Sequence, residues 1–419
     1  MKKRYQVLGM LSLLSAITYL DRACISVAGV RIKTELGLSN EQFGWVLAAF
    51  ALGYAAFDVP TGAMGDRIGP RRVLTRIVIW WSAFTSLTGL ARGYSTMLAI
   101  RFLFGAGEAG GAPNSSAAIS RWFPLAERAR AQSFVWMSTR LGGALAPLLI
   151  FPLQIKFGWR AAFYFLGIVG VIWAALWYWW FRDEPAQQPG IFAQEVLEIE
   201  ATRKIKKGHT SLPWKAVLVS ANFWALLLMY HLYLYGAYFY FSWLQTYLQE
   251  GRGFKEKDLA VYGTMPFIFG AVGCLLGGAA CDYLVRRIGL KWGRRAIAIV
   301  GLILASLTTL AAALAQTQTA VILLLSLGLA CKDFTLPVAW AVAIDIGKDH
   351  SGAVSGAMNT AGQIGSAVVA VLFGYLISAT HSYNAPLFVI AAMLLLSGLL
   401  WFKIDPTKSL ATPVDSGAH

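Results

Sequence analysis

Twelve apolar stretches, each long enough to cross a lipid bilayer as a helix, decide what this chain can fold into. The first six lie at about residues 7–30, 41–61, 75–95, 96–118, 131–152 and 161–181. Six more follow at about 220–247, 260–281, 296–315, 319–342, 352–378 and 385–403. A helix needs about 20 apolar residues to span the hydrocarbon core. Since 57% of the 419 residues are hydrophobic, more than a soluble core would bury, we predict an all-α membrane protein of six plus six spans.

The net charge of +15 reflects membrane topology rather than nucleic-acid binding. Counted from a cytoplasmic N-terminus, about two thirds of the 36 Lys and Arg residues fall in loops on the cytoplasmic side, roughly three times as many as on the opposite side. An even number of spans then places both termini in the cytoplasm. Residues 1–4 lead straight into a span without a small-residue cleavage site, so no signal peptide is expected.

A glycine–aspartate–arginine pattern occurs at matching places in the two halves. It comprises Gly62, Asp66, Arg67 and Arg71 after span two, and Gly278, Asp282 and Arg286 after span eight. Glycine four residues before the aspartate lets a neighbouring helix approach closely. The aspartate can pair with arginine or lie at a helix N-terminus. The repeated pattern resembles the signature loop of the major facilitator superfamily, which implies a conformational role; the alternative is a basic loop that only fixes orientation.

The repeat divides the chain into three parts. We predict a six-helix bundle at 1–181, a cytoplasmic linker at 182–219, and a second six-helix bundle with a short cytoplasmic tail at 220–419. In the linker, three glutamates precede a basic run in a helix-compatible pattern. We interpret this segment as a surface helix that tethers the two bundles.

Four charged residues lie inside the first and fourth apolar stretches: Asp21, Arg22, Arg101 and Glu108. A charged side chain at mid-bilayer costs roughly 2.5–3.5 kcal/mol on insertion scales, so such residues usually serve transport or pairing. Arg101 and Glu108 are seven residues apart, or two helical turns, and share one helix face. Asp21 and Arg22 are adjacent, about 100° apart around the helix, so they face different ways.

These charges suit a proton-linked anion carrier. Arginine stays charged and presents a planar fork that matches a carboxylate. A glutamate beside an arginine can switch between an ion pair and a protonated acid. We therefore expect Arg22 and Arg101 to bind the anion, Glu108 and Asp21 to carry protons, and Asp21 to contact span four. The alternative is a purely structural ion-pair network.

Further polar residues in the spans each have two interpretations. Arg140, in span five, either anchors the anion or neutralises Glu108. Asp58, in span two, either pairs with Arg140 or lies near the membrane surface. Asn359 and Gln363 share a face of span eleven, where they hydrogen-bond a hydroxylated substrate or join two helices.

Several patterns receive structural interpretations instead. Lys332-Asp333 in span ten is read as an internal pair without a substrate role. Residues 105–110 match the G-x-G-x-x-G dinucleotide fingerprint, but they lie within a span rather than between a strand and a helix, so we interpret these glycines as helix-packing residues. The four cysteines lack metal-ligand spacing, and the sequence contains no enzyme or ATPase motif, so we expect neither catalysis, metal nor cofactor.

Within the superfamily, three segments resemble the anion:cation symporter family: Tyr19-Leu-Asp21-Arg22, the stretch from Arg101 to Glu108, and Ser242–Leu248, which has Gln245 where proline is usual. Tyr54 also matches a family position that lines the cavity. The resemblance implies proton-driven uptake of an organic carboxylate, a hexonate or hexuronate above all, across a bacterial inner membrane. Asp58 departs from the family, which usually has glutamine there.

The expected function is therefore secondary active transport by alternating access. The partners are a small organic anion, protons and the lipid bilayer, without nucleic acid, and we expect a monomer. Tyr19, Tyr54, Arg140, Asn359 and Gln363 join the two arginines as candidate substrate-binding residues. Two alternatives are an exchanger or efflux transporter of organic anions or phosphate esters, and a non-transporting membrane sensor.

Overall fold

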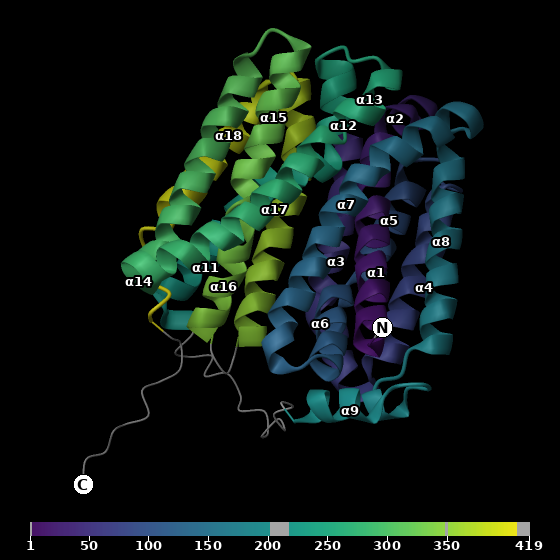
Figure 1. Ribbon diagram of the computed structural model, residues 1–419. Helices are drawn as coiled ribbons and strands as arrows, with labels where there is room; N and C mark the ends of the chain where they lie inside the picture. Colours follow the sequence, from purple (N-terminus) through teal and green to yellow (C-terminus); the bar gives the residue numbers. More distant parts are fainter. Residues whose placement is uncertain (1, 202–217, 348–350, 409–419) are drawn as a thin grey trace. The chain divides into compact units, whose positions relative to one another are not determined.

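The first half of the chain forms helices in each of its six predicted spans. The computed structural model describes residues 2–201, 218–347 and 351–408, and contains no strand in these ranges (Figure 1). The helices are α1 (Lys3–Val27), α2 (Gly29–Leu36), α3 (Asn40–Ile68), α4 (Pro70–Thr88), α5 (Tyr94–Glu108), α6 (Gly111–Trp122), α7 (Leu125–Phe157), α8 (Trp159–Trp180) and α9 (Ala193–Glu200).

The second half is likewise helical. Its helices are α11 (Ala221–Ser242), α12 (Leu244–Thr246), a π-helix (Tyr247–Gly251), α13 (Glu256–Tyr262), α14 (Met265–Leu314), α15 (Gln318–Asp333), α16 (Leu336–Gly347), α17 (Ser351–Thr380) and α18 (Ala385–Leu400). Gly289 has φ 81° and ψ 166°, which divides α14 into the two spans predicted there. Among the described residues, six helical stretches are by themselves long and apolar enough to cross a membrane.

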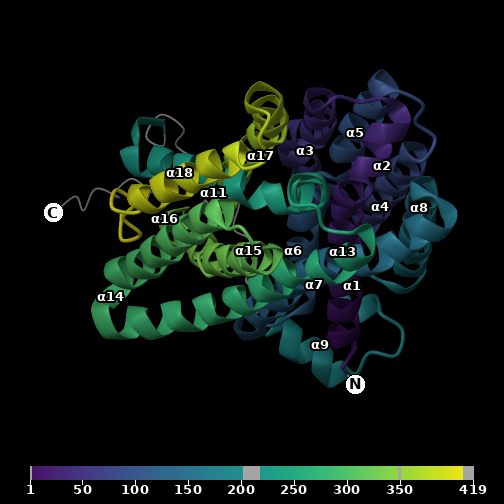
Figure 2. The same cartoon turned by 90° about the horizontal axis from the view of Figure 1, so that it is seen from above.

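The chain separates into two compact units. Unit 1 comprises Met1–Lys207, Phe241–Thr264 and Ala370–Ala379, and unit 2 comprises Gly208–Tyr240, Met265–Val369 and Thr380–His419. Within unit 1, α1 packs on α7, α3 on α5 and α4 on α8 (Figures 1 and 2). Within unit 2, α14 packs on α15 and α18.

Glycines bring α3 and α5 into direct backbone contact. A Cβ added at Gly105 of α5 would lie 2.1 Å from the carbonyl oxygen of Phe50 on α3. A Cβ added at Gly53 of α3 would lie 2.2 Å from the carbonyl oxygen of Phe102 on α5. Because neither position tolerates a side chain, the two helices lie close enough for charged residues of α5 to reach the aromatic residues of α3.

The fourth span is interrupted, which the sequence interpretation did not anticipate. Helix α5 ends at Glu108, and α6 begins at Gly111 after Gly110 adopts φ 83°. A non-glycine residue with this φ would be strained, and its Cβ would lie 2.6 Å from the hydroxyl of Thr61. Gly110 therefore breaks the span instead of only packing helices, whereas Gly105 does pack as predicted.

The linker contains a helix, α9, that caps α1. Helix α9 lies beside the N-terminus in Figures 1 and 2. The buried carboxylate of Glu195 accepts hydrogen bonds from the backbone amides of Lys3 and Arg4 at 3.0 and 2.9 Å. The first amides of a helix have no partner within it, so Glu195 supplies the missing acceptors and favourable charge.

Candidate substrate-binding and coupling site

The predicted charged residues of spans one and four meet inside unit 1. Arg22, from α1, donates through Nε to Oε1 of Glu108 at 2.6 Å, and its Nη2 contacts the same oxygen. The Arg22 side chain is 12% exposed and that of Glu108 is 2% exposed. Removing one partner of a charge pair buried this deeply destabilises the folded protein by about 3–5 kcal/mol, because the other charge is left without a partner. The direct ion pair with span four is thus made by Arg22.

Asp21 and Arg101 complete the cluster of charges. Both are 2% exposed. The carboxyl group of Asp21 interacts with the Thr85 hydroxyl of α4, whereas Oε2 of Glu108 makes no hydrogen bond to any residue in the described ranges. A buried carboxyl beside an arginine can change between an ion pair and a neutral acid, so both carboxyls are suited to exchanging a proton. Two carboxyl and two guanidinium groups therefore share one buried region.

Aromatic rings surround the two guanidinium groups. The Arg22 guanidinium lies 4.8, 5.1 and 5.0 Å from the ring centres of Tyr19, Phe50 and Tyr54. Arg101 lies over the rings of Phe50 and Phe104. Cation–π contacts of this kind contribute about 0.5–2 kcal/mol and are strongest where water is excluded. They hold both forks in place without neutralising their charge.

Phe50 was not among the predicted site residues, although a sequence signal for it exists. It precedes Tyr54 by four residues on α3, so both side chains lie on one helix face. Phe241 is a second residue that the sequence interpretation missed. Its ring centre lies 5.4 Å from that of Tyr19 and 5.8 Å from the Arg140 guanidinium.

Arg140 and Asp58 border this cluster within unit 1. Arg140, on α7, is 7% exposed. Its guanidinium lies over the Phe241 ring, which in turn packs against the Tyr19 ring. Glu108 forms an ion pair with Arg22, so neutralisation of Glu108 does not depend on Arg140 alone. Asp58 is buried within the protein, and its Oδ1 accepts a hydrogen bond from the Gly110 amide at 3.3 Å. Its negative charge lies at the N-terminus of α6, where the helix dipole favours it.

Unit 2 contains the remaining candidates. Lys332 and Asp333 form an ion pair at 2.7 Å, and the Tyr233 hydroxyl accepts from Lys332 and donates to Asp333. The pair is internal, as predicted, because its side chains are 1% and 0% exposed. Gln363 is buried and Asn359 is partly exposed on α17. The expected hydrogen bonds of Asn359 and Gln363 to a substrate remain predictions.

The structure describes part of each signature loop. Arg71 donates its backbone amide to Asp183 at 2.8 Å and its guanidinium to the Tyr178 carbonyl, at the end of the sixth span. Gly62, Asp66 and Arg67 are helical in α3, but their side chains lie outside the described residues. In the second loop, Asp282 and Arg286 are exposed, and Arg294 pairs with Asp345 at 3.1 Å.

Unit 1 also has a cluster of ion pairs that the sequence interpretation missed. Arg31 of α2 donates to both carboxylate oxygens of Glu256 on α13, at 2.8 and 2.9 Å. Lys33 pairs with Glu250 at 2.5 Å. These contacts join α2, in the first half of the chain, to a segment that follows span seven. No short sequence pattern predicts them, because the partners are more than 200 residues apart.

Comparison with known proteins accounts for this arrangement. The family model described as the Major Facilitator Superfamily matches residues 11–291 and 283–417, which together cover most of the chain. The chain belongs to the major facilitator superfamily. The fold and the resemblance predicted from the two signature loops are therefore confirmed, and the protein is a multi-pass membrane transporter of this superfamily.

Curated relatives cover almost the whole transporter. A protein of Cupriavidus necator named as a probable sulfoacetate transporter, SauU, is 36% identical over 98% of this chain and 96% of its own. The hexuronate transporter of Bacillus subtilis is 30% identical over 96% and 93%. A probable L-galactonate transporter of Escherichia coli is 29% identical over 92% and 86%. These relatives are of the predicted anion:cation symporter type.

A solved structure has the same fold. A bacterial homologue of the human lysosomal transporter Spinster, in an inward-facing and unoccupied conformation, aligns with a TM-score of 0.77. The alignment covers 96% of each chain at 20% sequence identity. At this identity the likeness establishes the fold.

Proposed function

We propose that this transporter carries a small organic anion into a bacterial cell together with protons. The observation that carries the proposal is the Arg22–Glu108 pair, buried beside Asp21 and Arg101. Relatives named for sulfoacetate, hexuronate and L-galactonate support a substrate with at least one acidic group. A sugar acid is favoured by two of those names, and a short sulfonated acid by the third.

In the proposed mechanism, the proton binds Glu108 and the anion binds Arg22, so each ligand favours binding of the other by separating one ion pair. When Glu108 is protonated, it no longer neutralises Arg22, and the guanidinium fork becomes free to bind a carboxylate. Arg101 supplies a second positive charge, and Tyr19 and Tyr54 offer hydroxyls close to the bound anion. Asp21, a buried carboxyl of the same cluster, serves as a second proton carrier.

Alternating access completes the proposal. Movement of the second six-helix half against the first would expose the anion first to one side of the inner membrane and then to the other. The two signature loops would control this movement, and Asn359 and Gln363 would contribute from α17. The loop charges support a topology with both termini in the cytoplasm. Labelling a cysteine at position 415 from the periplasmic side of intact cells would overturn this topology.

The proposed function is tested by uptake into proteoliposomes. We expect labelled sulfoacetate, hexonates or hexuronates to accumulate when the outside is acidic, and the protonophore-treated control to show only equilibration. A substrate that accumulates equally without a pH gradient would refute proton coupling. Strict exchange for internal phosphate esters would favour the alternative, an exchanger on the same fold.

A further inference from the structure

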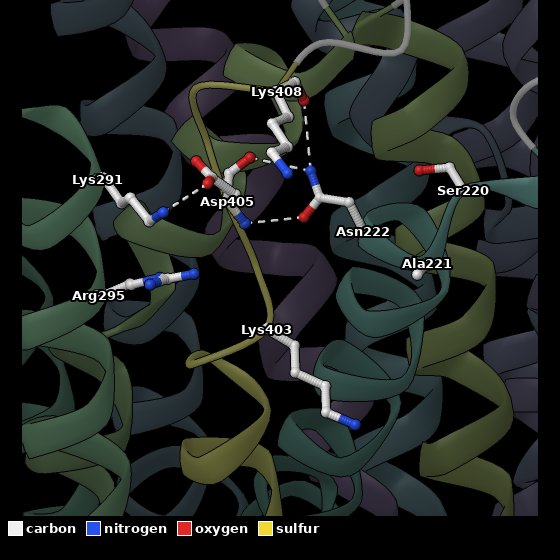
Figure 3. A pocket seen from close by; sticks show the side chains of 8 residues that line it. All are labelled: Ser220, Ala221, Asn222, Lys291, Arg295, Lys403, Asp405 and Lys408. Carbon is white, nitrogen blue, oxygen red and sulfur yellow. Dashed lines mark hydrogen bonds and ion pairs between the residues drawn. The ribbon is translucent and has the colours of Figure 1, made fainter.

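A basic pocket of about 540 Å³ lies at one end of unit 2 (Figure 3). It is lined by the start of α11, by the part of α14 that follows the Gly289 break, and by the segment after α18. Four of its side chains are cationic and one is a carboxylate, Asp405. None of the residues of the proposed substrate cluster in unit 1 lines this pocket.

Among the described residues, Asp405 forms an ion pair with one of the four cations of the pocket. Its Oδ2 pairs with the Lys291 ammonium at 2.8 Å. Burial by itself would raise the pKa of Asp405, but the Lys291 ammonium and the Thr407 hydroxyl and amide outweigh burial and lower this pKa to about 2. Asp405 is therefore ionised at neutral pH. In the described ranges, three cations of the pocket have no carboxylate partner: Arg295, Lys403 and Lys408.

Arg295 is positioned as an anion-binding group. Its side chain is 93% buried by the surrounding helices, since the residue is 7% exposed, and Nε donates to the Ile404 carbonyl at 2.8 Å. This bond fixes the plane of the guanidinium, while its two terminal nitrogens make no hydrogen bond to any described residue. Figure 3 shows the guanidinium directed from α14 toward the segment after α18. A fixed fork with two unused donors matches two oxygens of a phosphate.

The surroundings of the pocket favour a lipid over a soluble ligand. The pocket lies where spans end, because α18 ends at Leu400 and α11 begins at Ala221. Large apolar side chains beside it are exposed: Leu218, Val219, Trp292 and Phe402. A tryptophan at the end of a span is typical of the membrane interface. An acyl chain would cover these apolar side chains while the headgroup occupied the pocket.

We propose that this pocket binds the phosphate of an anionic phospholipid headgroup, with Arg295 as the fork and Lys403 and Lys408 as flanking charges. Basic pockets between helices at the cytoplasmic surface bind such headgroups, and each nearby cation contributes about 1 kcal/mol. The loss of one flanking lysine should therefore weaken binding about fivefold. Asn222 orders the wall of the pocket by donating to the Asp405 carbonyl at 2.9 Å.

The test is a titration of the detergent-purified full chain with dioleoyl-phosphatidylglycerol or dioleoyl-phosphatidylcholine, read by native mass spectrometry. Both lipids carry the phosphate, but only the first is anionic. We expect the wild type to prefer phosphatidylglycerol and Lys403→Gln to bind it about fivefold more weakly. The matched control is Arg287→Gln, which removes an exposed cation from α14 outside the pocket and should bind as the wild type does.

Three outcomes would overturn the assignment. Equal binding of the two lipids would exclude a preference for the anionic headgroup. An equal loss in Lys403→Gln and Arg287→Gln would mean that surface charge, and not this pocket, attracts the lipid. Displacement of phosphatidylglycerol by millimolar inorganic phosphate would reassign the site to a soluble phosphate compound. Arg295→Lys, which keeps the charge but loses the fork, should also bind phosphatidylglycerol more weakly if the pocket is correct.

Discussion

Replacing Glu108 by glutamine should separate anion binding from proton coupling. In the structure, Arg22 contacts Oε1 of Glu108 through both Nε and Nη2. An anion that binds Arg22 must therefore displace charged hydrogen bonds. Glutamine has nearly the same shape as glutamate but carries no charge, so it resembles the protonated residue permanently.

The size of the effect follows from the bonds that are removed. A hydrogen bond to a charged group contributes about 1.5–3 kcal/mol. If the anion no longer competes with one such bond, its affinity at neutral or basic pH should rise at least about tenfold. Because the amide cannot release a proton, accumulation driven by a pH gradient should be lost while counterflow exchange continues.

Binding is measured by calorimetry on the purified protein at basic pH, and transport by counterflow and pH-driven uptake in proteoliposomes. Glu127→Gln is the matched control. Glu127 also pairs with an arginine of α1, Arg4, at 2.9 Å, but it is 36% exposed and lies outside the cluster. It should bind and accumulate the anion as the wild type does.

The reasoning is refuted if Glu108→Gln still concentrates the anion against its gradient as the wild type does. Glu108 would then be a structural partner of Arg22, and the proton path would run elsewhere. If Glu108→Gln loses accumulation but binds the anion with unchanged affinity, Glu108 carries the proton but does not compete with the anion for Arg22.

Three further predictions test other parts of the structure. Arg101→Lys should lose most anion affinity, by about 1.5–3 kcal/mol, because a point charge cannot replace the fork; wild-type affinity in calorimetry would remove Arg101 from the site. Gly110→Ala should lower the melting temperature through a strain of about 1–2 kcal/mol, whereas Gly111→Ala, which meets nothing within 4 Å, should not. The charge reversals Arg31→Glu and Glu256→Arg should each reduce uptake, and the double reversal should restore it; no restoration would mean that this pair does not form during transport.

The sequence predicts the spans well because membrane helices are specified locally. A span needs only a sufficient run of apolar residues, and each predicted stretch has a helix or an interrupted helix in the structure. The charges of the candidate site are equally visible, since few residues of this kind lie within apolar stretches. Arg22 and Glu108 could be predicted to share a region of the first bundle for this reason.

The features that the sequence does not predict depend on which segments lie next to each other in the folded protein. Gly105 and Gly110 belong to the same G-x-G-x-x-G string, yet Gly110 breaks the span with φ 83° and Gly105 packs against Phe50. The pairing of Arg31 with Glu256 joins residues more than 200 positions apart. No helical periodicity contains that information.

The capping of α1 by Glu195 determines where this transporter can be dissected. The amides of Lys3 and Arg4 at the start of the first helix receive their acceptor from a residue near the middle of the chain, Glu195. During synthesis, the start of α1 is therefore left uncapped until α9 has left the ribosome. A fragment that stops at the end of α8 would lack the cap, whereas one that extends through Glu200 would retain it. Co-expression of the two halves from separate genes should accordingly use the longer fragment.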